Sequence, residues 1–359
     1  MVKKNYMRTF KLKQETPMIH FQSMDNGAII RATEFKPKLD KFLVKKIGDD
    51  WEGKKDWIMK QTDEDTDKPK ALNYKVKIFP DENCSVKKSN TKIIVKSKET
   101  VLYVNGYIHV EIMSFVSGLL DYIEENIQEF LIVTNFGTRQ SKGFGSFSIV
   151  KKGKNPVEIL NEKGYEFIYA YISNKKLSQV LDIAEIIYSI MKGGINRNSY
   201  IKGYIQRQYL DDIGKNNVGS DKAFIKSKIM PDDKESKNNV NYSEYKYDRE
   251  LLGVADSFSF RDKTRHGTVL IRSKEIQRFQ SLIQIVVSGN YLILIMKDKE
   301  EQNRILGQTF EFIGKKNKYK ISVPKEFDSK QFLAGYVKYF NNNRDKSLAA
   351  DIELKMGGM

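Results

Sequence analysis

The first part of the chain changes from a strand pattern to a helix pattern. Residues 6–13 alternate apolar and basic side chains, which is the period of a strand with one buried face. Thr16-Pro17 then signals a turn, and a short apolar piece follows at residues 18–21. Apolar residues next recur at helical spacing, at Phe35, Leu39, Phe42, Leu43 and Ile47. We predict a helix here that has Pro37 in its first turn and ends at Gly48.

Strand patterns surround a second helix between residues 74 and 150. Strand-like pieces occur at 74–79, 92–95, 101–104 and 107–112, and Asn105-Gly106 between the last two is a two-residue hairpin signal. A helix is predicted from the apolar face Phe115, Leu119, Leu120, Ile123 and Ile127. Further strands are predicted at 130–134 and 147–150. The elements therefore follow the order of a ferredoxin-like βαββαβ unit, which is strand, helix, two strands, helix and strand. Here a hairpin is inserted into that order.

A looser version of the same order follows downstream. We predict strands at 165–172, 223–229 and 267–272, helices at 178–191 and 327–340, and a hairpin of 281–287 with 291–296. Residues 232–249 are polar and are expected to form a long surface loop. The expected fold class is therefore α+β, with tandem ferredoxin-like (RRM-like) domains built on antiparallel sheets. We place the N-terminal domain at residues 1–175 and the C-terminal domain at 176–359.

Composition and charge narrow the function. The chain has 62 Lys plus Arg against 46 Asp plus Glu, a formal net charge of +16. Such an excess favours a polyanionic partner, because cations that neutralise phosphates release condensed counterions. A lysine-rich, AT-biased genome would produce the same excess, so both explanations remain open.

The same inventory excludes several classes of protein. No apolar stretch is long enough for a membrane span, and residues 1–6 are not followed by the apolar run of a signal peptide. Cys84 is the one cysteine, and the three histidines are scattered, so disulfide frameworks and Cys- or His-rich metal centres are excluded. We expect a protein of a reducing, intracellular compartment, the cytoplasm.

The most informative segment is the glycine-rich loop of residues 134–147. Gly137, Gly143 and Gly145 surround the cations Arg139 and Lys142. Glycines let backbone N–H groups approach phosphate oxygens, and the cations add charge-assisted hydrogen bonds. The spacing is neither that of a Walker A loop nor that of a Rossmann fingerprint. A hairpin loop that needs glycine only for positive φ angles is the alternative interpretation.

This segment resembles the glycine-rich loop of the CRISPR RAMP proteins, which are RNA-binding subunits with RRM-like folds. The run is Gly-Thr-Arg-Gln-Ser-Lys-Gly-Phe-Gly-Ser-Phe. Thr16-Pro17 before an apolar pair and Arg31 at the start of the first helix are similar to further features of that family. Residues 191–202 are also similar to that family, at its turn between a helix and a loop. Leu251-Leu252-Gly253 and the later residues 278–282 are similar to the second domain of Cmr-type members. In that second pattern Leu282 stands where proline is usual.

The resemblance implies an RNA-binding subunit of a type III CRISPR effector complex that holds the guide RNA backbone in antiviral defence. Its partners would be guide RNA and other effector subunits, with no metal, no organic cofactor and no membrane. Arg139 and Lys142 would grip phosphates, Gly137, Gly143 and Gly145 would permit backbone approach, and Phe144 would stack on a base or plug a domain interface. Arg31 would add charge, and Lys263 and Arg265 would extend the RNA path. A solvated turn is the alternative interpretation of the segment that holds Lys263 and Arg265.

Two other functions remain open at this stage. His20 follows an early strand and is a candidate general base for a metal-independent endoribonuclease that matures guide RNA. A partly buried structural histidine beside Met18 and Phe21 is the alternative interpretation of the same residue. The third possibility is a subunit that binds only proteins, with its charge serving solubility. We expect no enzymatic activity, because nucleophile motifs are absent and the acidic pairs fall in polar loops.

Overall fold

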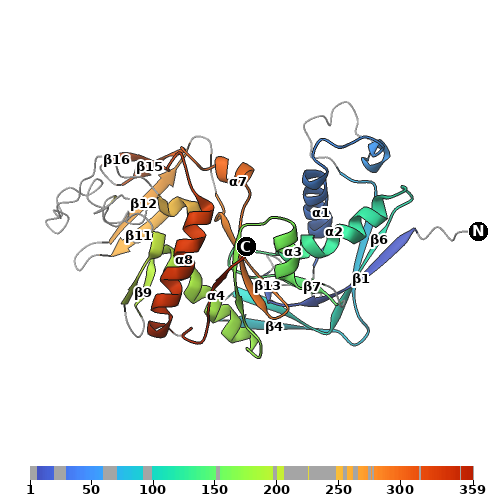
Figure 1. The fold of residues 1–359 in the computed structure, drawn as a ribbon, viewed down its shortest axis with the longest axis horizontal. Helices are drawn as coiled ribbons and strands as arrows, with labels where there is room; N and C mark the ends of the chain where they lie inside the picture. Colours follow the sequence, from blue (N-terminus) through green and yellow to red (C-terminus); the bar gives the residue numbers. More distant parts are fainter. Residues whose placement is uncertain are drawn as a thin grey trace, which may run out of the picture. The chain divides into compact units, whose positions relative to one another are not determined.

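The computed structural model describes residues 6–19, 30–59, 71–91, 99–150, 154–196, 200–205, 225, 248–253, 257–261, 266–273, 276, 279–314, 317–347 and 349–358. They form an α+β protein with several antiparallel sheets, as predicted (Figure 1). The chain divides into two compact units. The first unit comprises Met1–Lys163, Ile172–Asp182 and Ile285–Ile293, and the second comprises Gly164–Tyr171, Ile183–Gln284 and Leu294–Met359. The domain boundary predicted between residues 175 and 176 stays a prediction.

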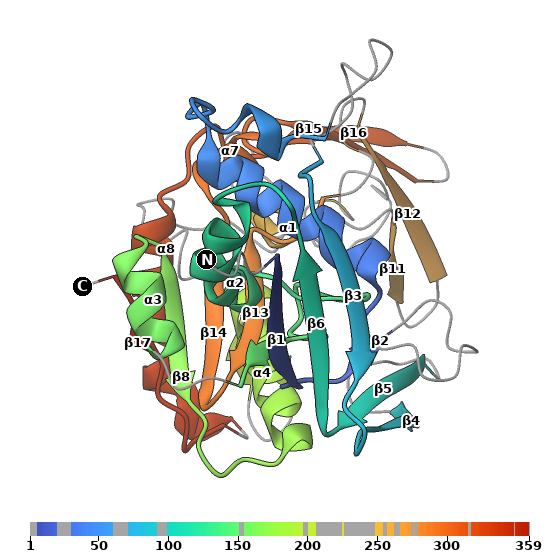
Figure 2. The same cartoon turned by 90° about the vertical axis from the view of Figure 1, so that its right-hand side faces the viewer.

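The main sheet of the first unit has the ferredoxin-like order. Along the chain come β1 (Met7–Gln14), α1 (Ala32–Ile47), β3 (Lys75–Pro80), β6 (Tyr107–Met113), α2 (Leu119–Val133) and β7 (Phe147–Ile149). In space the strands lie in the order β3-β6-β1-β7, and every neighbouring pair is antiparallel. Figure 2 shows β3, β6 and β1 side by side. The first and third strands of the βαββαβ unit thus lie in the centre, as expected for this motif.

The period-two pattern decides which face of this sheet is buried. Phe10 and Leu12 of β1 lie opposite Val110 and Ile108 of β6, and all four side chains are buried. They join one apolar core with the inner faces of α1 and α2, including Phe35 and Phe130. Each side chain of this size contributes about 1.5–3 kcal/mol when fully buried. Pro37 lies in the second turn of α1 rather than the first, because the helix already begins at Ala32.

The second predicted helix is displaced along the chain. Phe115 precedes α2 and is 74% exposed, while the helix continues to Val133. The prediction of a strand at 130–134 is therefore wrong. Phe130 continues the buried stripe of Ile123 and Ile127, and a short apolar run cannot by itself distinguish a buried strand from a buried helical turn. The glycine-rich segment consequently follows a helix.

Asn105-Gly106 does not form a hairpin turn. β5 (Glu99–Asn105) pairs with β2 (Met18–Ile19) and β4 (Ser85–Thr91), whereas β6 pairs with β1 and β3. The dipeptide therefore joins two sheets. Gly106 has φ of 114°, and a Cβ there would lie 3.0 Å from the Cα of Cys84, so the corner requires glycine. The strand predicted at 92–95 lies outside the described residues.

The remaining strands form three further sheets. One has the order β13-β14-β8-β17, and it contains the predicted hairpin of β13 (Ile283–Ser288) and β14 (Tyr291–Met296). Its other strands are β8 (Phe167–Tyr171) and β17 (Lys355–Met356). A second has the order β11-β12-β15-β16, and β9 (Gly194–Asn196) pairs with β10 (Tyr200–Lys202). The four strands of the second sheet are β11 (Ser257–Arg261), β12 (His266–Arg272), β15 (Thr309–Ile313) and β16 (Lys318–Ser322).

The predicted helices of the later part are also present. α4 spans Leu177–Lys192 and α8 spans Ser329–Asn343. Shorter helices are α3 (Pro156–Glu162), α7 (Lys299–Asn303) and the 3₁₀ turns η1 (Lys55–Trp57), η5 (Asp248–Leu252) and η6 (Arg344–Lys346). Within the described residues, no helix is both long and apolar enough to cross a membrane. Of the strand predicted at 223–229 only Ile225 is described, and it is helical rather than extended. Of the loop predicted at 232–249 only residues 248 and 249 are described, and they begin η5.

α8 packs through aromatic side chains in the second unit. Phe332, Tyr336 and Phe340 are fully buried, and the ring of Tyr204 contacts those of Phe332 and Tyr336. The Tyr336 hydroxyl donates to the carbonyl oxygen of Ile187, and complete burial raises the pKa of this phenol well above its ordinary value. Its proton therefore stays in place as a structural hydrogen bond over the whole physiological pH range.

Candidate nucleic-acid interface

Two motifs that are far apart in the sequence meet in the first unit. The amide of Thr138 donates to the carbonyl oxygen of Ile19 at 2.9 Å, and the amide of Gly145 donates to that of Pro17 at 2.9 Å. The Thr16 hydroxyl oxygen accepts from the amide of Ser146 at 2.9 Å. The turn at Thr16-Pro17 therefore serves to fix the segment between α2 and β7.

Asn135 is the buried centre of this arrangement. Its Nδ2 donates to the carbonyl oxygens of Gln140 at 2.6 Å and Ile285 at 2.7 Å. Its Oδ1 accepts from the Ser146 hydroxyl at 2.8 Å, and the Ser146 oxygen accepts from the amide of Val287 at 3.2 Å. One fully buried side chain thereby joins the two ends of the glycine-rich segment to residues 285–287 of the same unit.

The glycine amides of the segment are used within the protein. Gly137 donates to Oε1 of Glu34 at 2.8 Å, Gly143 donates to the carbonyl oxygen of Gln140 at 3.2 Å, and Gly145 donates to Pro17. All three residues have positive φ angles, of 81°, 86° and 75°. These amides do not face a ligand, so we reassign the three glycines from phosphate contact to shaping the loop.

Phe144 also has a structural position. Its side chain is 1% exposed, so neither face of the ring is open to a nucleotide base. The role of base stacking that the sequence suggested does not fit this burial, and Phe144 is a core residue instead.

The two cations of the segment emerge from one tight turn. The amide of Lys142 donates to the carbonyl oxygen of Arg139 at 2.9 Å, and Arg139 has a positive φ of 56°. Lys142 is exposed and Arg139 is half-buried. Arg31 is the half-buried N-cap of α1, whose first turn contributes the Glu34 that holds Gly137. RNA contact by these three cations stays a prediction.

A further cation in this region was not predicted from the sequence. Nζ of Lys38 donates to Oε1 of Glu34 at 2.8 Å and to the carbonyl oxygen of Asn135 at 2.7 Å. Burial lowers the pKa of Lys38, and the hydrogen bond with Glu34 opposes that shift. Lys38 is therefore a structural cation rather than an RNA contact.

Three predicted site residues lie in parts of the chain that the structure does not describe. His20, Lys263 and Arg265 lie outside the described residues, so their roles stay predictions. His109 is described, and its ring stacks on Phe79 with 5.3 Å between the ring centroids. In the part of the chain that the structure describes, no group of three or more His, Cys, Asp or Glu side chains is arranged to hold a metal ion.

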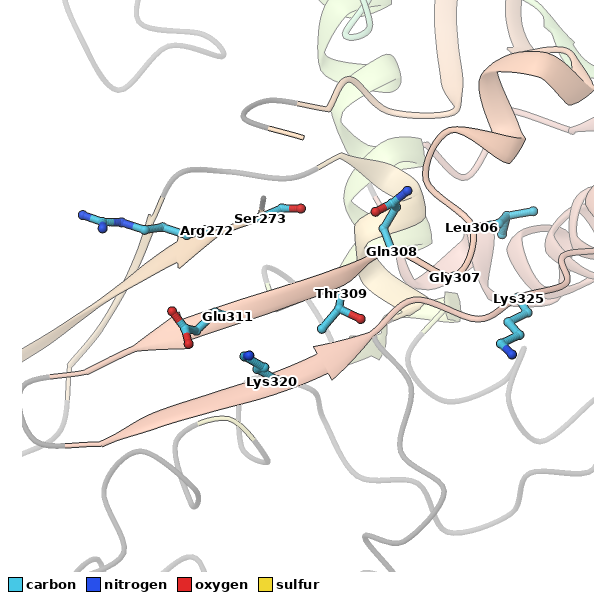
Figure 3. Close-up of a pocket in the computed structure, with 9 residues that line it drawn as sticks. All are labelled: Arg272, Ser273, Leu306, Gly307, Gln308, Thr309, Glu311, Lys320 and Lys325. Atoms are coloured by element: carbon cyan, nitrogen blue, oxygen red, sulfur yellow. The ribbon is translucent and has the colours of Figure 1, made fainter. Parts of the chain in front are cut away.

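The second unit contains a cleft of about 830 Å³ that was not predicted from the sequence (Figure 3). Three cations line it together with one carboxylate and several neutral groups. The lining residues are Arg272, Ser273, Leu306, Gly307, Gln308, Thr309, Glu311, Lys320 and Lys325.

Strand register brings the charged residues of the cleft together. Arg272 of β12 lies opposite Glu311 of β15, which in turn lies opposite Lys320 of β16. Their neighbours along the strands, Ile271, Phe310 and Ile321, are buried, so they belong to the opposite face of the sheet. In residues 318–321 lysine alternates with tyrosine and isoleucine, a pattern that indicates a strand with one basic face. The sequence did not show that this strand would be in register with Arg272.

The cations of the cleft are available to a ligand. Among the described residues, Arg272, Lys320 and Lys325 form no ion pair with a carboxylate. Together with Glu311, which also lines the cleft, they give four formal charges that sum to +2. An anionic ligand would find charge-assisted hydrogen bonds here from both guanidinium and ammonium groups.

Models of one protein family match both halves of the chain. Residues 5–195 match the family model for the Cmr1 N-terminal domain, and residues 197–356 match that for the Cmr1 C-terminal domain. No curated protein matches the chain.

Two solved structures are similar to parts of the chain. One is Cmr1 from Pyrococcus furiosus in its apo form, with 12% identity, a TM-score of 0.41 and coverage of 82% of this chain and 89% of that one. The other is a chain of the type III-B Cmr-beta complex bound to cognate target RNA, with 14% identity, a TM-score of 0.27 and coverage of 40% and 58%.

Proposed function

Because the chain belongs to the Cmr1 family along nearly its whole length, we propose that it holds the backbone of guide RNA within its complex. As a member of this family it is a RAMP subunit of a type III CRISPR effector complex. Its expected partners are the guide RNA and the neighbouring effector subunits. A cytoplasmic location is part of the proposal.

The cleft of the second unit is the observation that carries the RNA proposal. Arg272, Lys320 and Lys325 line a concave surface without carboxylate partners in the described structure. Its volume of about 830 Å³ is within the range of ligand pockets, roughly 300–1,000 Å³. Phosphate contacts from such cations bind RNA irrespective of its sequence. That property suits a subunit whose guide differs from one complex to the next.

Removing two cleft lysines is expected to weaken RNA binding strongly. For Lys320→Ala with Lys325→Ala, we expect affinity for single-stranded RNA to fall by roughly tenfold or more, since each phosphate contact contributes on the order of 1 kcal/mol. The dependence of log affinity on log salt should become less steep by about one to two. Fluorescence anisotropy with a labelled RNA between 50 and 200 mM salt, a range of about fourfold, measures both quantities.

The control removes equal charge from the same unit. Lys330→Ala with Lys338→Ala takes two exposed lysines from α8, which lie outside the cleft lining. If both double variants bind RNA alike, or if the affinity of the unaltered protein does not depend on salt, the cleft is not the RNA site.

The same assay tests the turn at Arg139 and Lys142. We include both cations in the proposed RNA path, because they leave one tight turn that loses little loop entropy on binding. Arg139→Ala with Lys142→Ala should weaken binding more than Lys55→Ala with Lys163→Ala, which removes two exposed lysines from the same unit. Equal effects would leave this turn with a structural role alone.

We further propose that the chain binds RNA without cleaving it. The chain has three histidines, and the ring of His109 stacks on that of Phe79 while its Nε2 lies 3.6 Å from Oδ2 of Asp81. Purified protein should therefore leave single-stranded and repeat RNA intact, both with Mg²⁺ and with EDTA, when the products are separated by gel electrophoresis. Cleavage in EDTA that disappears in His20→Ala would instead identify a guide-maturation endoribonuclease.

A further inference from the structure

One face of the β3-β6-β1-β7 sheet carries aromatic rings between lysines. It is opposite to the face that packs on α1 and α2, because its side chains alternate with the buried residues of each strand. Phe79, His109 and Lys11 form one row across β3, β6 and β1, and Tyr107 lies opposite Lys13 in the next row. Figure 2 shows these three strands side by side.

The rings are already arranged for stacking. The Phe79 and His109 rings are nearly parallel, at 18°, with centroids 5.3 Å apart. Nζ of Lys77 lies 4.9 Å from the centroid of Phe79, and Nζ of Lys11 lies 4.3 Å from that of Tyr107. Tyr107 is 36% exposed, and the side chain of Lys77 is 73% exposed.

Charge on this face remains positive after its acidic groups are counted. Lys11 pairs with Asp81 at 2.9 Å, and the hydrogen bond from Lys11 lowers the pKa of Asp81. Lys77 lies 4.0 Å from Glu111. With Glu15, three carboxylates stand against four lysines, Lys11, Lys13, Lys75 and Lys77, which leaves a formal charge of +1. Glu15, which pairs with Lys13 at 3.3 Å, has a buried side chain and also accepts from the Ser148 hydroxyl.

We propose that this face binds unpaired bases of single-stranded RNA, with Phe79, His109 and Tyr107 as stacking surfaces and the lysines as phosphate contacts. The inference rests on the proposed function, since it gives the same RNA partner a second contact of different chemistry. Aromatic rings in a basic setting are how single strands are bound without sequence preference. Cores of protein–protein interfaces are depleted in lysine, so a protein neighbour fits this face less well.

The test separates stacking from charge with two probes. One is a single-stranded RNA, and the other is an abasic ribose-phosphate chain of the same length. Phe79→Ala with Tyr107→Ala should lower affinity for the RNA by about tenfold or more and leave affinity for the abasic chain within about twofold. Lys320→Ala with Lys325→Ala should weaken the binding of both probes. Tyr171→Ala with Tyr200→Ala is the matched control, because these tyrosines are 58% and 61% exposed elsewhere in the chain.

A second measurement uses the unaltered protein. Ultraviolet crosslinking to the RNA followed by mass spectrometry should identify peptides that contain Phe79 or Tyr107. Crosslinks confined to other peptides, together with unchanged RNA affinity of the Phe79→Ala, Tyr107→Ala variant, would overturn the inference.

Two further outcomes are decisive. If that variant binds RNA normally but no longer associates with effector subunits, the face is a protein interface and the inference is wrong. If the unaltered protein binds neither probe at low salt, the proposed function fails and this inference fails with it.

Discussion

Gly145→Ala is expected to destabilise the protein by about 3 kcal/mol or more. Gly145 has φ of 75°, which costs any residue with a Cβ roughly 1–2 kcal/mol. In addition, the new Cβ would lie 1.8 Å from the carbonyl oxygen of Phe136, a backbone atom that cannot rotate away. Relieving that overlap must displace the Phe136 amide, which donates to the carbonyl oxygen of Gly145 at 2.9 Å. Equilibrium unfolding in guanidinium chloride measures the loss.

Gly53→Ala separates the cost of the positive φ angle from the cost of the steric overlap. Gly53 has a similar φ of 68° and lies in the same unit, but nothing lies within 4 Å of the position of its Cβ. This variant should lose only the conformational cost, roughly 1–2 kcal/mol. Equal losses in the two variants would mean that the segment around Gly145 is not packed as described.

Asn135→Asp should destabilise the first unit by about 3 kcal/mol or more at neutral pH. The substitution keeps the size of the side chain but replaces the amide nitrogen, which donates to Gln140 and Ile285, with an oxygen. A buried carboxylate would then face two carbonyl oxygens with no donor between them. Thermal or chemical unfolding of the variant against the unaltered protein measures the difference.

The loss of stability caused by Asn135→Asp should increase as pH rises. Burial and the facing carbonyl oxygens raise the folded-state pKa of the new carboxyl above its unfolded value of about 3.9. The folded state therefore binds the proton more tightly, so the penalty is smallest below about pH 4 and grows as pH rises through the folded pKa. Asn155→Asp is the control, because Asn155 caps α3 at a half-buried position where Asp serves equally well as the cap. A penalty at residue 135 that stays constant from about pH 4 to pH 7 would contradict this account.

Sequence patterns alone predicted an element correctly where the pattern arises within that one strand or helix. The alternation of residues 6–13 predicted β1, and the helical spacing from Phe35 to Ile47 predicted α1, because periods of two and 3.6 are local properties of strands and helices. The order of elements then predicted the ferredoxin-like unit, which β3-β6-β1-β7 confirms. The glycine-rich run and Thr16-Pro17 indicated the RAMP proteins, and the Cmr1 family models bear this out.

Tertiary structure decided what the same residues do. Whether Asn105-Gly106 closes a hairpin depends on which strands β5 and β6 pair with, and those partners are distant in sequence. The amides of Gly137 and Gly145 would be free for phosphate in an isolated loop, but Glu34 and Pro17 occupy them in the folded unit. Arg272 and Lys320 become neighbours of Glu311 only through strand register. In each case the outcome depends on residues that are remote along the chain, and a local pattern carries no information about which remote partner is reached.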